Sequence, residues 1–568
     1  MRITKRAAGL AGVATLALLA TACGTSPAPT TSAGGTAAPS GTAAPAPAGS
    51  GGEIVIRGCT PENPLIAGNT SEVCGGNILD AVTSKLVHYN VDTAAPEMDI
   101  AESIETTDNK LFTVKLKEGY KFSDGTDVLA KNFVDAWNYT AFGPNGQQGG
   151  YFYEPIAGFA DLQCTGESED AAGNDLDPCE GDGAPKAETL SGLKVVDDRT
   201  FTIETTEAVS NLPVRLGYSA FAPQPDAFFA DPKADAFGKQ PIGAGPYKVA
   251  SNSATEIVLE KNADYSGEYA GNVDKVTFRM YTDPSASYAD LLANNVDVVD
   301  VIPPDQLAGD AWKAALGDRA QVAETGIIQW ITFMPTDEQL KDNTKLRAAL
   351  GAAIDRDTIT KEIFNGSRTP ATGWVSPVVD GYKEGQCTDG CTFDEAKAKT
   401  LYEESGGYEG QLTISVNPDA GHELWAQAIC NGWKNTLGVD CAVNVTPDFA
   451  TLRTQIKAGE LKGIVRGGWQ MDYPSIENFL TPIYGKGAAS NDSKYDNPAF
   501  QQALTDAAAA TDAAAANAKY QEAEAMLDET YPTLPLWYSA TPYGYSTKVD
   551  NVKLNAFGAI DVAGITVK

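Results

Sequence analysis

Histidine is almost absent from this sequence, which has only His88 and His422 among 568 residues. Two histidines provide few general bases or zinc ligands, and the nine cysteines form no Cys-x-x-Cys pair, so a zinc site is disfavoured. The sequence also lacks G-x-S-x-G, H-E-x-x-H, a phosphate-binding P-loop and a G-x-G-x-x-G segment after a strand. Acidic residues are plentiful, so a catalytic carboxylate pair stays open, but no spacing singles one out. We therefore expect a protein without catalytic residues, metal or cofactor.

Basic residues are scarce compared with acidic ones. The chain has 42 Lys and Arg against 75 Asp and Glu, which gives a formal net charge of −33. Such a surface repels nucleic acid and anionic membranes, so neither is an expected partner. The length predicts several domains, and 43% hydrophobic residues are enough to build large cores.

The first 23 residues have the pattern of an export signal. Three basic residues within Met1–Arg6 precede an apolar run from Ala7 to Ala20, which is too short to span a bilayer permanently. Thr21-Ala22-Cys23 then resembles a lipobox, with Ala20 where leucine is usual. We expect a lipid on Cys23 that tethers the protein outside the membrane. The alternative is an ordinary cleaved signal with a free cysteine; either cleavage leaves 39 basic against 75 acidic residues, or −36.

Residues 24–52 are almost entirely Gly, Ala, Pro, Ser and Thr, a composition that predicts a disordered spacer. The eight cysteines after Cys23 lie as neighbours along the chain, and an exported protein favours disulfides. Sequence alone does not fix connectivity. Pairing of neighbours closes short loops and predicts Cys59–Cys74, Cys164–Cys179, Cys387–Cys391 and Cys430–Cys441; metal binding is the rival interpretation.

Strands and helices alternate along the rest of the chain, which favours α/β lobes. Thr126 or Asp127 is expected to cap a helix with Phe133, Val134 and Trp137 on its apolar face. The acidic segment between Cys164 and Cys179 is expected to be a surface loop. The other predicted elements are strands at 54–56, 111–116 and 273–281, a hairpin at 195–205, and helices at 77–86, 286–292 and 503–527.

The segment Arg466–Tyr473 places a cation, two glycines, an indole and a carboxylate within eight residues. A strand leaves backbone groups free to pair, and Gly467 and Gly468 would let another backbone approach. These groups match a peptide, which needs a carboxylate for its ammonium, a cation for its carboxylate and an exposed strand for its amides. The alternative is a buried strand that ends in a turn at Pro474 with a structural ion pair.

Four further segments carry a family resemblance. They are Phe122-Ser123-Asp124-Gly125 with the helix after it, Gly243-Ala244-Gly245-Pro246-Tyr247, residues 346–356, and Trp433-Lys434-Asn435-Thr436-Leu437-Gly438-Val439. In this order they resemble the signatures of the peptide/nickel-type solute-binding proteins of ABC importers, with Ala244 in place of a usual threonine. The resemblance runs from Glu53 to Lys568 and is nearest to bacterial oligopeptide-binding lipoproteins.

The resemblance implies an α/β, two-lobed periplasmic-binding-protein-like fold with an additional third domain and a hinge between the lobes. One lobe would combine residues 53–84, 223–326 and 541–568. The additional domain would span 85–222 and be attached to that lobe. The other lobe would span 327–540.

The resemblance also implies a binding site. Asp472 would receive the α-ammonium of a peptide, and the strand Gly468-Trp469-Gln470 would bond its backbone. Arg466 would face the carboxylate end. His422, eleven residues before Trp433, would lie near the carboxylate too, although a lone histidine is more often a surface or capping residue. Three further groups are implied: Tyr151 and Tyr153 over the first ligand residues, Phe449 as an aromatic wall, and Ser71-Glu72-Val73 as an opposing strand; each aromatic is as readily a core residue.

The sequence thus predicts a monomeric, lipid-anchored extracytoplasmic protein that binds short peptides between closing lobes for an ABC permease and its ATPase subunits. Two alternatives stay open. The same fold serves non-peptide ligands such as a metal chelate, haem or an oligosaccharide. A secreted hydrolase or an adhesin is the other class, and no nucleophile or metal supports the hydrolase.

Overall fold

The computed structural model describes residues 51–166, 179, 181–418 and 421–568. The predicted signal segment, the lipidation at Cys23 and nearly all of the spacer lie outside these residues. So does most of the loop between Cys164 and Cys179.

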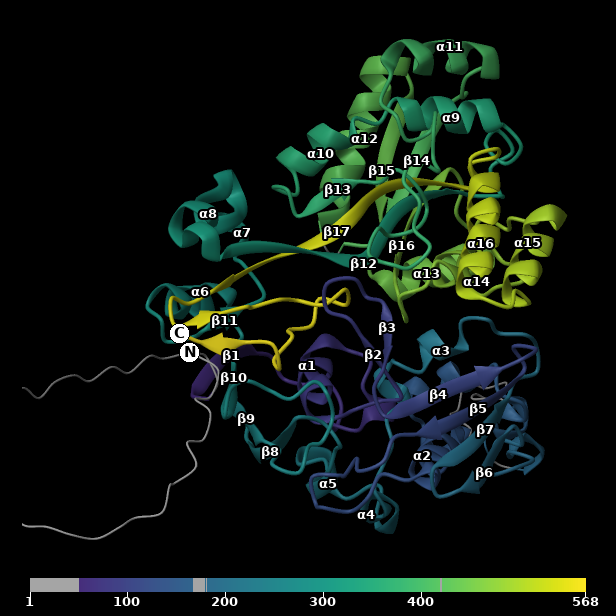
Figure 1. The fold of residues 1–568 in the computed structure, drawn as a ribbon. Helices are drawn as coiled ribbons and strands as arrows, with labels where there is room; N and C mark the ends of the chain where they lie inside the picture. Colours follow the sequence, from purple (N-terminus) through teal and green to yellow (C-terminus); the bar gives the residue numbers. More distant parts are fainter. Residues whose placement is uncertain (1–50, 167–178, 180, 419–420) are drawn as a thin grey trace, which may run out of the picture. The chain divides into compact units, whose positions relative to one another are not determined.

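The largest sheet has eleven strands and is organised around two long ones, β12 (Ala320–Phe333) and β17 (Thr533–Tyr545) (Figure 1). These two pair antiparallel from Ala320 opposite Gly544 to Thr332 opposite Thr533. Residues 533–540 are buried without alternation, as expected for a strand covered on both faces. The order is β15 (Asp440–Val445), β14 (Gln411–Val416), β16 (Ile464–Gln470), β12, β17, β11 (Val298–Val299), β1 (Glu53–Gly58), β10 (Lys275–Met280), β9 (Glu256–Lys261) and β8 (Tyr247–Asn252), with β13 (Arg368–Pro370) on β17.

Three smaller sheets accompany it. A four-stranded antiparallel sheet has the order β4 (Ala101–Thr106), β5 (Leu111–Leu116), β7 (Thr200–Glu204), β6 (Leu193–Asp197), and two-stranded sheets join β2 (Val87–Tyr89) to β3 (Pro96–Met98) and β18 (Val549–Asp550) to β19 (Thr566–Val567). The predicted hairpin at 195–205 is confirmed as β6 and β7. The predicted strands at 54–56, 111–116 and 273–281 are confirmed as β1, β5 and β10.

The helices surround these sheets. They are α1 (Val73–Val82), α2 (Ala130–Ala141), α3 (Leu212–Arg215), α4 (Asp226–Ala230), α5 (Asp235–Lys239), α6 (Pro284–Leu292), α7 (Pro304–Leu307), α8 (Ala311–Leu316), α9 (Thr344–Ala352), α10 (Arg356–Glu362), α11 (Glu395–Ser405), α12 (His422–Leu437), α13 (Phe449–Ala458), α14 (Glu477–Tyr484), α15 (Pro498–Ala508) and α16 (Ala513–Leu527).

The main hydrophobic cores draw on different parts of the chain. One is built almost wholly from residues 328–538 and contains five buried tryptophans. A second comes from residues 86–221 and includes Phe133, Val134 and Trp137 of α2. A third joins residues 54–82, 247–298 and 543–565, and a smaller cluster covers 288–316. These cores support the proposed division into three domains, which stays a proposal. The first domain combines 53–84, 223–326 and 541–568, the second is 85–222 and the third is 327–540.

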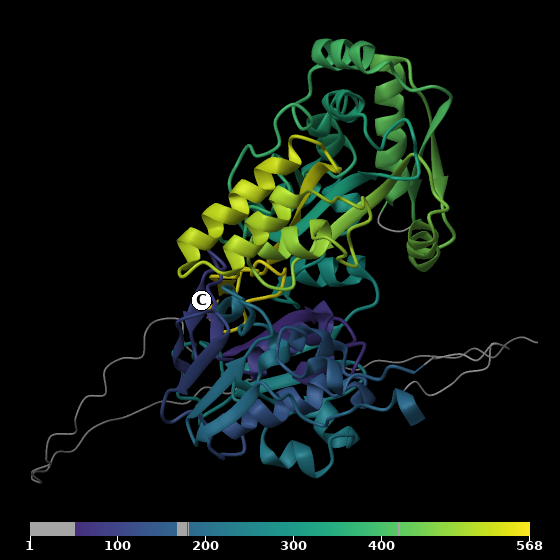
Figure 2. The ribbon, with the colours of Figure 1, turned by 90° about the vertical axis from the view of Figure 1, so that its right-hand side faces the viewer.

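Two helix boundaries differ from the prediction. Thr126 and Asp127 do not cap α2, because Asp127 still pairs with Lys121 in a β-bridge and the helix begins three residues later. The single helix predicted at 503–527 is two helices, α15 and α16, which lie side by side (Figure 2). The break arises because the Asp512 side chain accepts a hydrogen bond from the amide of Ala515 and so starts a new helix.

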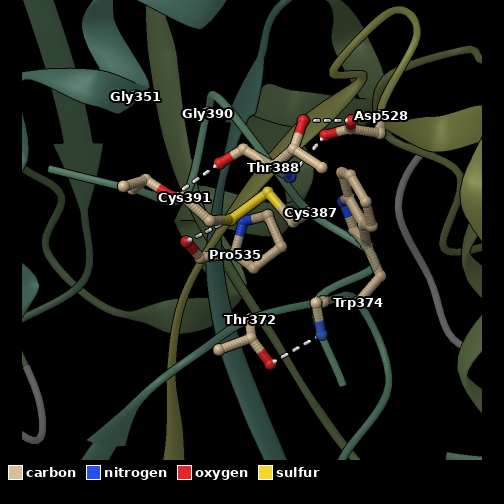
Figure 3. Close-up of a disulfide and its surroundings, with 12 residues drawn as sticks. Gly351, Thr372, Trp374, Cys387, Thr388, Gly390, Cys391, Asp528 and Pro535 are labelled. Atoms are coloured by element: carbon tan, nitrogen blue, oxygen red, sulfur yellow. Dashed lines mark hydrogen bonds between the residues drawn. A yellow bond between two sulfur atoms is a disulfide. The ribbon is translucent and has the colours of Figure 1, made fainter. Parts of the chain in front are cut away.

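All eight described cysteines form disulfides, between the neighbouring pairs Cys59–Cys74, Cys164–Cys179, Cys387–Cys391 and Cys430–Cys441. The shortest loop, Cys387–Cys391, is held to its surroundings (Figure 3). The amide and hydroxyl of Thr388 both donate to Asp528, at 2.8 and 2.6 Å. The carbonyl of Gly390 would be 2.4 Å from a Cβ at position 351, so Gly351 is required for this loop to pack on α9.

Candidate functional site

The strand β16 has one edge without a strand partner. Its full length pairs with β12, from Ile464 opposite Phe333 to Gln470 opposite Ile327. On the other edge β14 pairs only with Ile464 and Val465. Among the described residues, no strand covers that edge from Arg466 to Gln470, and Gly468 and Gln470 are exposed. This is the kind of edge to which an extended peptide adds as a further strand.

The two glycines of β16 have different roles. A Cβ on Gly467 would lie 2.1 Å from Nε1 of Trp330, so this glycine makes room for an indole rather than for a second backbone. The nearest atom to a Cβ on Gly468 is the Ile328 carbonyl oxygen, at 3.3 Å. Close approach of another chain is therefore a feature of Gly468 and not of Gly467.

Asp472 lies just beyond the exposed edge and is held by neutral donors. Its Oδ1 accepts from the Tyr151 hydroxyl at 3.2 Å, and its Oδ2 accepts from the Asn478 amide at 3.1 Å. Asn478 also accepts from the Asp472 backbone amide and the Trp469 indole, both at 2.9 Å. Burial raises the pKa of the Asp472 carboxyl, although the bonds from Asn478 and Tyr151 oppose the shift. Among the described residues Asp472 forms no ion pair.

A buried polar cluster supports the turn after Asp472. The Tyr473 ring packs in the core of residues 86–221, with the Arg215 guanidinium 4.7 Å from the ring centre. Glu477 accepts from Tyr473 at 2.7 Å, Asn211 at 2.8 Å and Arg215 at 3.3 Å. These contacts join α3 to the start of α14 and fix the backbone that carries Asp472. Sequence reasoning missed Arg215, Glu477 and Asn478, because their roles depend on contacts between distant segments.

Arg466 lies at the opposite end of the exposed edge. Its Nε donates to Asn417 at 2.7 Å, and its guanidinium stacks 4.9 Å from the centre of the Phe449 ring. Phe449 is 46% exposed, which suits an aromatic surface that a ligand can contact. Arg466 and Phe449 therefore form one unit, which sequence spacing did not indicate.

His422 is only 7% exposed and begins α12. Its Nδ1 lies 3.0 Å from the Trp425 indole nitrogen and 3.1 Å from the Gln329 amide nitrogen. The indole N–H can only donate, so Nδ1 is an acceptor and the proton of a neutral ring sits on Nε2. This geometry makes His422 a buried ring that is held in place by Trp425 and Gln329.

Two predictions need correction. Tyr153 has no exposed surface, and its hydroxyl donates to the Ala220 carbonyl inside a core, so it cannot lie over a ligand. Tyr151, by contrast, is 51% exposed and donates to Asp472, so its place over a ligand stays a prediction. Ser71-Glu72-Val73 is not a strand: Glu72 is the N-cap of α1 and accepts from the Gly75 amide at 2.8 Å, and Val73 is the first helical residue.

A cavity of 170 Å³ adjoins this region. Gln470 of β16 lines it, together with Glu72 and Val73 at the start of α1 and residues 555–563 near the C-terminus. The α1 residues named by the resemblance therefore face the same hollow as the exposed strand edge, although they do so from a helix.

Comparison with known proteins identifies the family of the chain. The sequence pattern of "Bacterial extracellular solute-binding proteins, family 5 Middle" matches residues 95–491. The chain belongs to this family. The oligopeptide-binding protein OppA of Bacillus subtilis (strain 168) is 25% identical over 491 residues, which cover 84% of this chain and 85% of OppA. The heme-binding protein A of Haemophilus influenzae is 26% identical over 67% of this chain and 70% of its own length.

The fold has a close structural counterpart as well. The unliganded open form of the murein tripeptide-binding protein MppA superposes with a TM-score of 0.79 at 21% identity, over 92% of this chain and 99% of MppA. Members of the family are extracytoplasmic substrate-binding components of ABC importers and not enzymes. The predicted two-lobed α/β fold is confirmed. In the described part of the chain, no helix is long and apolar enough to cross a bilayer.

Proposed function

We propose that this solute-binding protein takes up short oligopeptides in extended form and presents them to an ABC permease with its ATPase subunits. The observation that carries the proposal is the exposed edge of β16 from Arg466 to Gln470, which ends beside Asp472. The main-chain amides of a bound peptide extend the sheet there, so this part of the binding energy is available to peptides of different sequence.

Asp472 receives the α-ammonium group. The carboxylate is half-buried, accepts hydrogen bonds only from neutral donors and has no ion-pair partner among the described residues. A buried carboxylate is costly until a cation completes the pair, and an α-ammonium with three donors does so. The Tyr151 ring, exposed beside Asp472, covers the first ligand residue.

Arg466 receives the carboxylate end of the peptide. Asp472 lies six positions after Arg466, which is roughly 20 Å in an extended strand and sets the scale of a short peptide. The stacking of Arg466 on Phe449 holds the guanidinium at the strand edge. His422, whose ring is buried and held by Trp425 and Gln329, contributes a polar group near this end.

Delivery follows from the fold and the proposed anchor. A lipid on Cys23 keeps the protein at the outer face of the cell membrane, and closure of the lobes around the peptide gives the permease a shape to recognise. One relative is a heme-binding protein, so the same fold with a non-peptide ligand is the competing function.

The test compares free with N-acetylated peptides on Asp472→Ala, with Asp506→Ala on the exposed face of α15 as the matched control. Leaving one charge of a buried pair without its partner costs about 2–5 kcal/mol, so affinity for free peptides falls at least about thirtyfold. Acetylated peptides lack the ammonium, so their affinity changes little. Equal losses for both peptides in calorimetry would remove Asp472 from this role.

A further inference from the structure

The 170 Å³ cavity beside β16 is too small for a whole peptide, since pockets for drug-sized ligands hold about 300–1,000 Å³. It is separate from both proposed contacts of the peptide termini, because neither Asp472 nor Arg466 lines it. Gln470 lines it, however, so it opens beside the strand edge on which the peptide main chain would lie. Its size and place therefore fit one side chain of the bound peptide.

The walls of the cavity are aromatic. His88 stacks on Tyr269 with 3.8 Å between ring centres, and Tyr89 lies 5.7 Å from Phe557. Phe557 in turn lies 6.3 Å from Tyr218. Burial, with the charge of Lys85, lowers the pKa of His88 to about 4, so this ring is neutral near pH 7. Flat rings with negative faces attract a cation that lies over them.

The charge of the lining is mainly negative. Glu72, Asp80, Asp99 and Asp561 line the cavity, and among the described lining residues only Lys85 opposes them, with its Nζ 2.9 Å from Asp80. Burial is the main cause of the raised pKa values of Tyr89, Tyr218 and Asp561, and the Asp80 charge adds to each of these shifts.

Two of these carboxylates are short of donors. Oε2 of Glu72 is buried and has no hydrogen-bond partner among the described residues. The Asp561 side chain accepts only the Gly564 backbone amide, at 3.2 Å, within the same part of the chain. A cationic group with N–H donors, such as an ammonium or a guanidinium, can donate hydrogen bonds to both carboxylates and balance their charge. A neutral hydrocarbon can do neither.

We propose that this cavity is a subsite for the lysine or arginine side chain of a bound peptide, so that the protein prefers basic peptides. The inference rests on the proposed peptide-binding function. The aliphatic stem of such a side chain packs against the rings, and its charged end reaches the carboxylates. The excess negative charge of the whole chain draws cationic peptides toward the same place.

The test uses alanine peptides of three to five residues that carry a single lysine or a single norleucine at each position in turn. Norleucine matches the lysine stem and lacks the charge. At one position, lysine is expected to bind at least tenfold more tightly in calorimetry, which is about 1.4 kcal/mol. Arginine is expected to behave as lysine does, and phenylalanine as norleucine does.

The variant Asp561→Asn is expected to cut the lysine preference to about threefold or less, because it removes a carboxylate from the wall of the cavity. Asp318→Asn, an exposed carboxylate away from the cavity, is the control and keeps the preference. If alanine peptides bind but lysine and norleucine are equal at every position, the subsite is refuted and the proposed function stands. If the phenylalanine peptide binds more tightly than the lysine peptide, the cavity is an apolar subsite, and the proposed cationic subsite is refuted. If no peptide binds, both proposals fail.

Discussion

Glu524 of α16 is a buried carboxyl group whose ionisation controls stability. It has no exposed surface, its Oε1 accepts from the Trp374 amide at 2.9 Å, and its Oε2 has no hydrogen-bond partner in the described part of the chain. Burial raises its pKa from 4.5 to about 7, although the Trp374 amide bond opposes the shift. The folded protein therefore holds a proton on this group that the unfolded chain releases near pH 4.5.

The magnitude follows from linkage. Because the folded-state pKa is the higher one, the stabilisation is complete below pH 4.5 and is lost as the pH rises through 7. A difference of 2.5 pKa units at 1.36 kcal/mol each amounts to about 3 kcal/mol. Glu524→Gln keeps the shape, carries no charge and loses this dependence. Relative to wild type, the variant should gain about 3 kcal/mol between pH 4 and pH 8.

Urea unfolding of both proteins at five pH values, followed by tryptophan fluorescence, measures this difference. Other titrating groups are common to both proteins and cancel. Glu522→Gln, on the exposed face of the same helix, is the control and should track wild type at all pH values. A constant difference between Glu524→Gln and wild type from pH 4 to pH 8 would show that Glu524 does not hold its proton.

Two further substitutions address the strand and its carboxylate. Gly467→Ala places a methyl group 2.1 Å from Trp330 and should lower the free energy of unfolding by about 1–3 kcal/mol. Gly468→Ala should lower it by less than about 1 kcal/mol. Equal effects of the two variants in urea unfolding would contradict the roles assigned to the two glycines. Tyr151→Phe removes the hydroxyl that donates to Asp472 and should weaken binding of free peptides by about 0.5–1.5 kcal/mol, with unchanged affinity in calorimetry as the contrary result.

Much of the fold was predictable because its signals are local. The pattern of apolar residues predicted the strand β5 and the hairpin at 195–205, and the family motifs predicted the two-lobed architecture. The long alanine run concealed the break before α16, since alanine favours helix throughout and only the Asp512 cap marks the restart.

The candidate site was predictable in part. The segment Arg466–Tyr473 holds a cation, an indole and a carboxylate close together in the sequence, so these residues could be named from the sequence alone. Tyr151 and Tyr153 are indistinguishable in sequence, and only packing shows that one is exposed and the other is in a core. The Asn478 contact, the Phe449 stack on Arg466 and the cavity wall come from segments distant in the chain, and no local pattern indicates them.

Native mass spectrometry can show which solutes the protein binds. The protein is mixed with equimolar short peptides, free and N-acetylated, and with candidate non-peptide solutes such as haem. This measurement tests most directly the central claim that the β16 edge and Asp472 bind a peptide through its main chain and its ammonium group. We expect a family of one-to-one complexes with the masses of many different free peptides, and much weaker signals from N-acetylated ones. A single discrete non-peptide mass, with no peptide bound, would contradict it.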